Sequence, residues 1–220
     1  GNNGMQYMPH NVQVSPDGEL VWVTANASMD EEDHQGFRFI EIAYADSGHE
    51  DTETMSDQLI SIDPATDEIV RRIPIGVDQH LSHVVQSENW VYVAAQETDT
   101  IYVLDADSMT VARSIMLPKG SGPHGMRLSP DGTTLYIAFL TGKALGIVNT
   151  RSGQLTSQKL NGAAVQTAVT PDGSQVAVSV YDSRSVALYS PTSQTLKYAT
   201  LPSGAHGPLQ LYPTNDSRSI

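Results

Sequence analysis

The stretch that decides the fold is Pro123-His124-Gly125-Met126-Arg127-Leu128-Ser129-Pro130-Asp131-Gly132. Close copies of it occupy residues 9–18 and 164–173, and a looser copy occupies residues 209–216. Apolar residues alternate before the Pro-Asp-Gly turn, in which Pro restricts φ and Gly accepts a positive φ. The stretch therefore predicts a short β-strand that enters a tight turn, and this unit recurs along the chain.

The copies keep a regular period. Their turn prolines at 130, 171 and 213 lie 41 and 42 residues apart. A second marker, the polar turn position at Asp63, Asp105, Asn149 and Ser190, recurs after 42, 44 and 41 residues. Four short strands within about 40–45 residues is the size of one propeller blade. No stretch shows helical periodicity, so the prediction is an all-β propeller of four-stranded blades.

The blade count predicts an incomplete ring. Four blades are expected at about residues 10–76, 80–118, 123–161 and 164–202, and a fifth begins near Gly207. Closed propellers have about four to eight blades, and an open array leaves strand edges uncovered. We therefore expect residues 1–220 to be a single propeller domain, incomplete at its C-terminus. The missing blades would come from the remainder of the chain or from another segment.

Composition restricts the classes of partner. The chain has 25 Asp+Glu against 12 Lys+Arg, for a formal net charge of -13. We expect no nucleic-acid partner, because phosphate backbones are bound through Lys and Arg. No apolar run approaches the ~20 residues of a membrane helix, so we expect no membrane insertion. The absence of cysteine excludes disulfides and thiolate metal sites, and it suits an oxidising compartment. The predicted location is periplasmic or extracellular.

Blade one carries an acidic insert of about 32 residues at positions 27–57. Its Asp30, Glu31, Asp33 and Glu50 could bind Ca²⁺, which prefers oxygen ligands. Alternatively, His34 and His49 could bring a transition metal to the insert. The simpler interpretation is a solvated acidic loop, which could still cover the channel mouth or contact a partner.

Histidines recur where blades begin. His10 and His124 occupy the same repeat position, and His206 is shifted from it by one residue. In blade two either His80 or His83 is expected at that position, and blade four breaks the series with Val165. First strands line a propeller channel, so these imidazoles should converge and could bind copper or a similar metal. The alternative is that they are structural and bond backbone groups at the strand entrances.

The strings Ser129-Pro130-Asp131-Gly132-Thr133-Thr134-Leu135-Tyr136-Ile137-Ala138 and Trp22-Val23-Thr24-Ala25-Asn26 resemble the Tyr-Val-Thr-Asn family of β-propeller repeats. That group is similar to the propeller of nitrous oxide reductase and, in plan, to copper-dependent thiocyanate dehydrogenases. The resemblance implies about seven blades and a histidine-bound copper site. Its metal candidates are the same five side chains: His10, His80, His83, His124 and His206.

Two functions from different classes follow. The first is an exported propeller that binds a transition metal, copper being favoured, and that would be a copper-dependent oxidoreductase if it is an enzyme. The second is a non-enzymatic periplasmic or cell-surface scaffold with structural histidines, which binds a protein partner or a small-molecule ligand at one propeller face. The chain has no nucleophile elbow, phosphate loop or zinc-protease motif, so no catalytic residue can be assigned.

Overall fold

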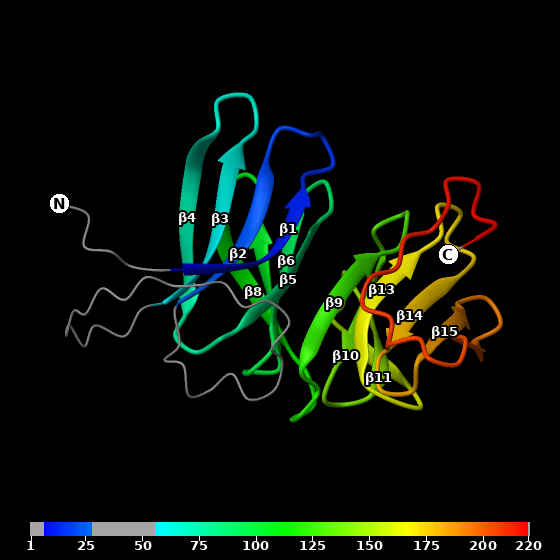
Figure 1. The fold of residues 1–220 in the computed structure, drawn as a ribbon. Helices are drawn as coiled ribbons and strands as arrows, with labels where there is room; N and C mark the ends of the chain where they lie inside the picture. The colour runs from blue at the N-terminus through cyan, green and yellow to red at the C-terminus, as the bar shows by residue number, and fades with distance from the viewer. Residues whose placement is uncertain (1–6, 28–55, 220) are drawn as a thin grey trace.

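The computed structural model describes residues 7–27 and 56–219, and these form an all-β array (Figure 1). Four antiparallel sheets of four strands follow one another along the chain. In each sheet the strands lie in sequence order, so strands that follow one another along the chain are neighbours in the sheet. The predicted β-propeller architecture of four-stranded blades is confirmed. Within these ranges, no helix is long and apolar enough to cross a membrane.

Blade one consists of strands that are consecutive except for the insert: β1 (Tyr7–Val14), β2 (Val21–Ala27), β3 (Asp57–Asp63) and β4 (Glu68–Gly76). Blade two consists of β5 (Leu81–Gln86), β6 (Trp90–Ala95), β7 (Thr100–Asp105) and β8 (Thr110–Met116). The acidic insert lies between β2 and β3, almost wholly outside the described residues.

The other two blades have the same plan. Blade three consists of β9 (Pro123–Leu128), β10 (Thr134–Phe139), β11 (Ala144–Asn149) and β12 (Leu155–Lys159). Blade four consists of β13 (Ala164–Val169), β14 (Val176–Val180), β15 (Ser185–Ser190) and β16 (Thr195–Thr200). After β16, residues 201–219 contain no strand, but they pass beside blade four in Figure 1.

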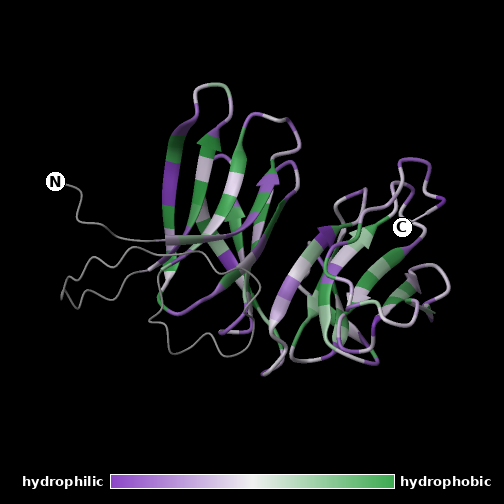
Figure 2. Cartoon of the chain, viewed as in Figure 1, coloured by the Kyte–Doolittle hydropathy of each residue, from purple (hydrophilic) through white to green (hydrophobic). Residues whose placement is uncertain are grey.

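The first strand of each blade is the inner one. β1 contacts β5, β5 contacts β9, and β9 contacts β13, whereas the fourth strands lie at the opposite edges of the sheets. The alternating hydropathy visible in Figure 2 buries one apolar layer between each pair of neighbouring blades. The layers centre on Trp22 between blades one and two, Met126 between two and three, and Tyr136 between three and four.

Each inner strand contains a β-bulge close to its start. In β1 the register with β2 shifts between Pro9 and Asn11, which leaves His10 as the extra residue. The corresponding shift falls at Ser82 in blade two, and it spans residues 124–125 in blade three and 165–166 in blade four, so that His124 and Val165 begin it. The prediction that His80 or His83 occupies this position in blade two is therefore wrong, because Ser82 does. Ser82 lies five residues before Ser87, which is the spacing of His10 from Ser15, so the shorter turn of blade two, and not the bulge, is what misled the prediction.

Candidate functional site

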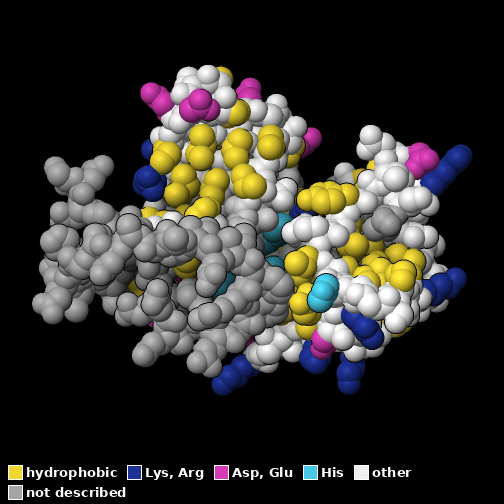
Figure 3. Space-filling view, viewed as in Figure 1, with side chains coloured by type: hydrophobic (Ala, Val, Ile, Leu, Met, Phe, Trp, Pro, Cys, Tyr) yellow, Lys and Arg dark blue, Asp and Glu magenta, His cyan; other side chains and the backbone are white. Residues whose placement is uncertain are grey.

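The bulges bring His10 and His124 together at the inner edge of the blades. Their ring centroids lie 5.4 Å apart at an interplanar angle of 73°. His80, in the connection that leads into β5, also packs against His10, with a centroid distance of 5.2 Å. Imidazole side chains are visible in the crease between the two halves of the molecule (Figure 3). Three of the five predicted positions therefore form one axial histidine cluster: His10, His80 and His124.

Two histidines of the cluster are held in one tautomer. His10 Nδ1 lies 2.9 Å from the carbonyl oxygen of Ser82, and His124 Nδ1 lies 2.8 Å from that of Val165. A carbonyl oxygen only accepts, so each Nδ1 carries the proton and donates. Each Nε2 is then left with a free lone pair, which is the state in which histidine binds a metal ion or takes up a proton.

These imidazoles are neutral at pH 7. Burial lowers the pKa of His124 to about 4, and the neighbouring His10 adds to the effect. The pKa of His10 is also lowered, by the protein packed around its ring, although one face of the side chain stays exposed. Burial disfavours the imidazolium in both cases. The cluster therefore offers uncharged, partly accessible nitrogen ligands.

His83 has a different role from the rest. It lies on β5 beside the bulge, and its Nε2 is 2.7 Å from Arg127 Nη1 and 3.0 Å from the Met126 carbonyl. Arg127 Nη1 also donates to that carbonyl at 2.8 Å. Burial, followed by the Arg127 charge, holds the pKa of His83 well below its usual value.

The remaining candidates do not join the cluster. His206 is exposed in the segment after β16. The insert residues His34, His49, Asp33 and Glu50, and with them Asp30 and Glu31, lie outside the described residues. Within residues 7–27 and 56–219, no group of three or more His, Asp or Glu side chains is arranged to hold a metal ion. The imidazole nitrogens of His10 and His124 thus fit a transition metal. The described residues do not add a third side chain arranged to bind the same ion.

Two residues that sequence reasoning missed belong to this region. Ser82 takes the bulge position in blade two, and its Oγ donates to the Pro123 carbonyl of blade three at 2.8 Å. Arg127 contributes a guanidinium between β5 and β9. Ser82 could have been found from its spacing, since it lies five residues before Ser87 as His10 lies five before Ser15, whereas Arg127 looked like an ordinary polar position of an alternating strand. In both cases the contact that matters is with the next blade.

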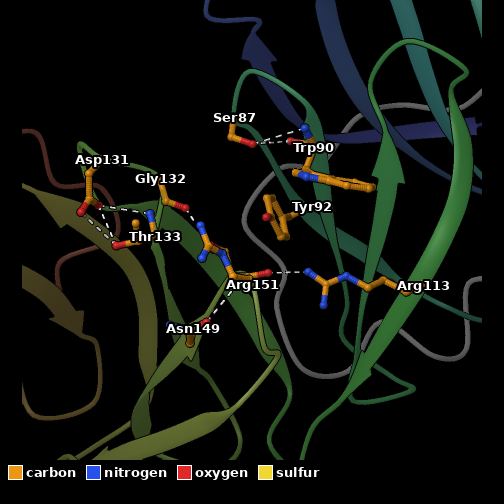
Figure 4. Close-up of a pocket in the computed structure, with 10 residues that line it drawn as sticks. Ser87, Trp90, Tyr92, Arg113, Asp131, Gly132, Thr133, Asn149 and Arg151 are labelled. Carbon is orange, nitrogen blue, oxygen red and sulfur yellow. Dashed lines mark hydrogen bonds between the residues drawn. The ribbon is translucent and has the colours of Figure 1, made fainter.

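A second hollow lies at the opposite, turn end of blades two and three (Figure 4). Its volume is about 740 Å³, and Trp90, Tyr92, Arg113 and Arg151 are among its lining residues. Arg113 reaches from β8 to the carbonyl of Thr150 and joins the two blades there. Burial raises the pKa of Tyr92, so its phenol stays protonated. This cleft contains none of the histidines.

Comparisons with known proteins agree on the fold. No protein-family model matches the chain, and no curated protein matches it. Among solved structures, an inactive histidine-to-alanine variant of Staphylococcus aureus virginiamycin B lyase with quinupristin superposes with a TM-score of 0.74 at 14% identity. The superposition covers 98% of this chain and 63% of the lyase chain. Hydrazine synthase of Kuenenia stuttgartiensis superposes with a TM-score of 0.68 at 18% identity, covering 91% and 52%.

These likenesses establish the propeller fold and do not extend to activity. The chain spans 63%, 65% and 60% of the length of three lyase structures that it resembles. The resemblance to the Tyr-Val-Thr-Asn repeats and to copper propellers stays a prediction.

Proposed function

We propose that this chain supplies the blades of an axial ligand-binding propeller, in which His10 and His124 bind a transition-metal ion, with copper favoured. The observation that carries the proposal is the pair of Nδ1-to-carbonyl hydrogen bonds, which leaves an unprotonated Nε2 on each of two rings whose centroids lie 5.4 Å apart. Two imidazoles bound to one ion at ~2 Å have their ring centres roughly 5 Å apart, close to the spacing of this pair.

Copper is the preferred ion because imidazole is a borderline ligand and the Irving–Williams order favours Cu²⁺. Bound copper would supply one-electron chemistry, and oxidoreductase activity is part of the proposal only in that sense. The residues of this chain would bind the ion, keep their tautomers fixed through Ser82 and Val165, and exclude protons from Nε2. Export to the periplasm or cell surface belongs to the same proposal, supported by the absence of cysteine.

Metal analysis of matched variants tests the proposal. In His10→Asn/His124→Asn the amide nitrogen can replace Nδ1 as the donor to each carbonyl, while the Nε2 ligand is removed. We expect purified wild-type protein, dialysed against Cu²⁺, to retain about one ion per chain and the double variant to lose it. His206→Asn, at an exposed histidine outside the cluster, is the control and should keep its copper. Equal copper content in wild type and the double variant would overturn the metal proposal.

A second candidate is a scaffold whose histidines are structural, and a specific observation favours it as well. Each of the two hydrogen bonds crosses from one blade to the next, from β1 to Ser82 and from β9 to Val165. In this case the imidazoles hold neighbouring blades together, and one propeller face binds a protein partner or a small molecule. A wild-type protein that retains no metal, and that His124→Leu destabilises but His124→Asn does not, would favour the scaffold.

A further inference from the structure

The guanidinium of Arg127 is only half used by the protein. Its Nη1 donates to the carbonyl of Met126 at 2.8 Å and to His83 Nε2 at 2.7 Å. These two bonds use both hydrogens of Nη1. Across residues 7–27 and 56–219, no hydrogen bond involves Nε or Nη2 of Arg127. The Nε–Nη2 edge, which is the edge that receives a carboxylate or phosphate in a bidentate pair, therefore makes no hydrogen bond to these residues, and Tyr212 is the group that interacts electrostatically with the guanidinium.

No carboxylate balances this charge in the part of the chain that is described. The two ion pairs found there join Lys143 to Asp182 and Arg218 to Asp216. Burial lowers the pKa of Arg127, which shows that the cation is partly removed from water. A partly desolvated charge without a counter-ion is unfavourable unless something supplies one.

The groups around Arg127 are neutral. His83 and the Met126 carbonyl hold Nη1, and burial followed by the Arg127 charge keeps the pKa of His83 well below its usual value. The inner edge of the blades therefore presents a fixed positive charge, although the chain as a whole carries a net charge of -13. A partly buried cation attracts anions more strongly than a fully exposed one does.

We infer that Arg127 binds the oxyanion of a ligand in the axial channel, through its Nε–Nη2 edge, with His83 and the Met126 carbonyl fixing the orientation of the guanidinium. The ligand class is a small molecule with a carboxylate or phosphate group. This inference rests on the axial channel being the ligand site of the proposed function, and it does not depend on a metal being bound there.

Oxyanion binding by metal-free protein tests the inference. Protein dialysed against EDTA is titrated with inorganic phosphate and, separately, with acetate, with sodium chloride at matched ionic strength as the reference. Binding is followed by calorimetry and by the midpoint of thermal unfolding, which rises with ligand when the folded state binds it. We expect saturable binding of at least one of the two oxyanions and none of chloride. A stronger response to phosphate or to acetate identifies which oxyanion group the site prefers.

Matched arginine variants assign the site. Arg127→Gln should lose the saturable response, and Arg127→Lys, which keeps the charge but not the bidentate edge, should bind about tenfold more weakly. Arg72→Gln, at an exposed position on β4, is the control and should bind like wild type. Wild-type binding by Arg127→Gln, or an equal response to chloride and to both oxyanions, would overturn the inference.

Two further measurements keep the test decisive. If Arg127→Gln does not fold, the Nε–H resonance of Arg127 in ¹⁵N-labelled wild type must shift with phosphate or acetate, and an unchanged resonance rejects the site. The His10→Asn/His124→Asn variant must still bind the oxyanion under EDTA. If this variant loses copper but still binds the oxyanion, the two sites are independent of each other, and either proposal can then fail without the other.

Discussion

The two ends of the inner strands differ in how closely the blades repeat each other. At the turn end, a Ser or Thr hydroxyl donates to an Asp carboxylate two residues later in three blades and in the segment after β16, with distances of 2.5–2.7 Å. At the bulge end, the corresponding residues are His10, Ser82, His124 and Val165. The first end is nearly uniform, and the second changes from blade to blade.

The turn end of the inner strands serves the folding of each hairpin, whereas the bulge end carries the candidate ligand-binding groups. Every turn-end bond lies within one hairpin, so the same residues solve the same local problem each time. Side chains at the bulge end reach the next blade instead: His10 reaches Ser82, Ser82 reaches Pro123, and His124 reaches Val165. Val165 cannot donate a side-chain hydrogen bond and ends this row. Positions that vary within a regular repeat are therefore where the candidate ligand groups lie.

The largest expected effect is a loss of stability in mild acid caused by the bulge-end histidines. The folded state holds the pKa of His124 at about 4, against 6.5 for the free side chain. Between these values the unfolded chain binds the proton and the folded chain does not, so stability falls as pH falls from about 6.5 to 4. At about 1.4 kcal/mol for each pKa unit, His124 accounts for up to about 3 kcal/mol.

Urea unfolding at a series of pH values measures this loss. His124→Asn, which does not titrate in this range, should flatten the profile between pH 6.5 and 4. If the stability of the variant falls with pH as steeply as that of wild type, proton uptake by His124 on unfolding is not the cause of the loss.

Gly125→Ala is expected to destabilise the same end by about 1–3 kcal/mol through overpacking. A Cβ at this position would lie 2.0 Å from Gln166 Oε1 and 2.6 Å from the Cα of Gln166 in the next blade. Denaturant unfolding of Gly125→Ala, Gln166→Ala and the double variant gives the coupling. Only partial rescue is expected, because the backbone of residue 166 remains in the way. Full additivity of the two single effects would mean that the added methyl group does not meet the side chain of Gln166.

Opposite substitutions at the turn end should give smaller effects of opposite sign. Gly132 has φ 67° in the blade-three turn, and Ser217 occupies the equivalent place in residues 214–217 with φ 59°. Gly132→Ala should cost about 1 kcal/mol, because a Cβ disfavours this conformation. Ser217→Gly should be stabilising by less than that, since the hydrogen bond from Asp172 N to Ser217 Oγ is lost. Thermal unfolding compares both with wild type, and a shift of the same sign in both would contradict the equivalence of the two turns.

The smallest effect concerns the turn aspartates at low pH. Hydrogen bonds to the carboxylates, from the backbone N–H of Ser174 first in the case of Asp172, lower the pKa of Asp172 to about 2 and also lower that of Asp131. The folded state thus favours the ionised form, and this stabilisation is present above pH 3.8 and is lost as pH falls toward 2. Asp172→Asn should weaken the acid dependence of circular dichroism in that window only. Any change above pH 5 would indicate a role beyond the turn.

Local sequence patterns predicted the blade architecture but not the contacts between side chains of neighbouring blades. The four copies of the turn, the four-stranded blades and the equivalence of His10 with His124 could be predicted, because each depends on residues near in sequence. Ser82 was missed although it lies five residues before Ser87, the same spacing as His10 to Ser15, because the turn of blade two is shorter than the turns of the other blades. The Arg127–His83 contact joins residues 44 apart in sequence, so no local pattern predicts it.

Sequence alone thus determined the all-β blade architecture, because turn chemistry and the alternation of apolar residues act within one hairpin and repeat with it. The tertiary structure decided which histidines meet, which nitrogen of each is protonated, and that the Nε–Nη2 edge of Arg127 makes no hydrogen bond within the described residues. These properties depend on which side chain of one blade faces which carbonyl of the next. That is fixed by the packing of blades around the axis, where residues distant in sequence desolvate one another and set each other's charge.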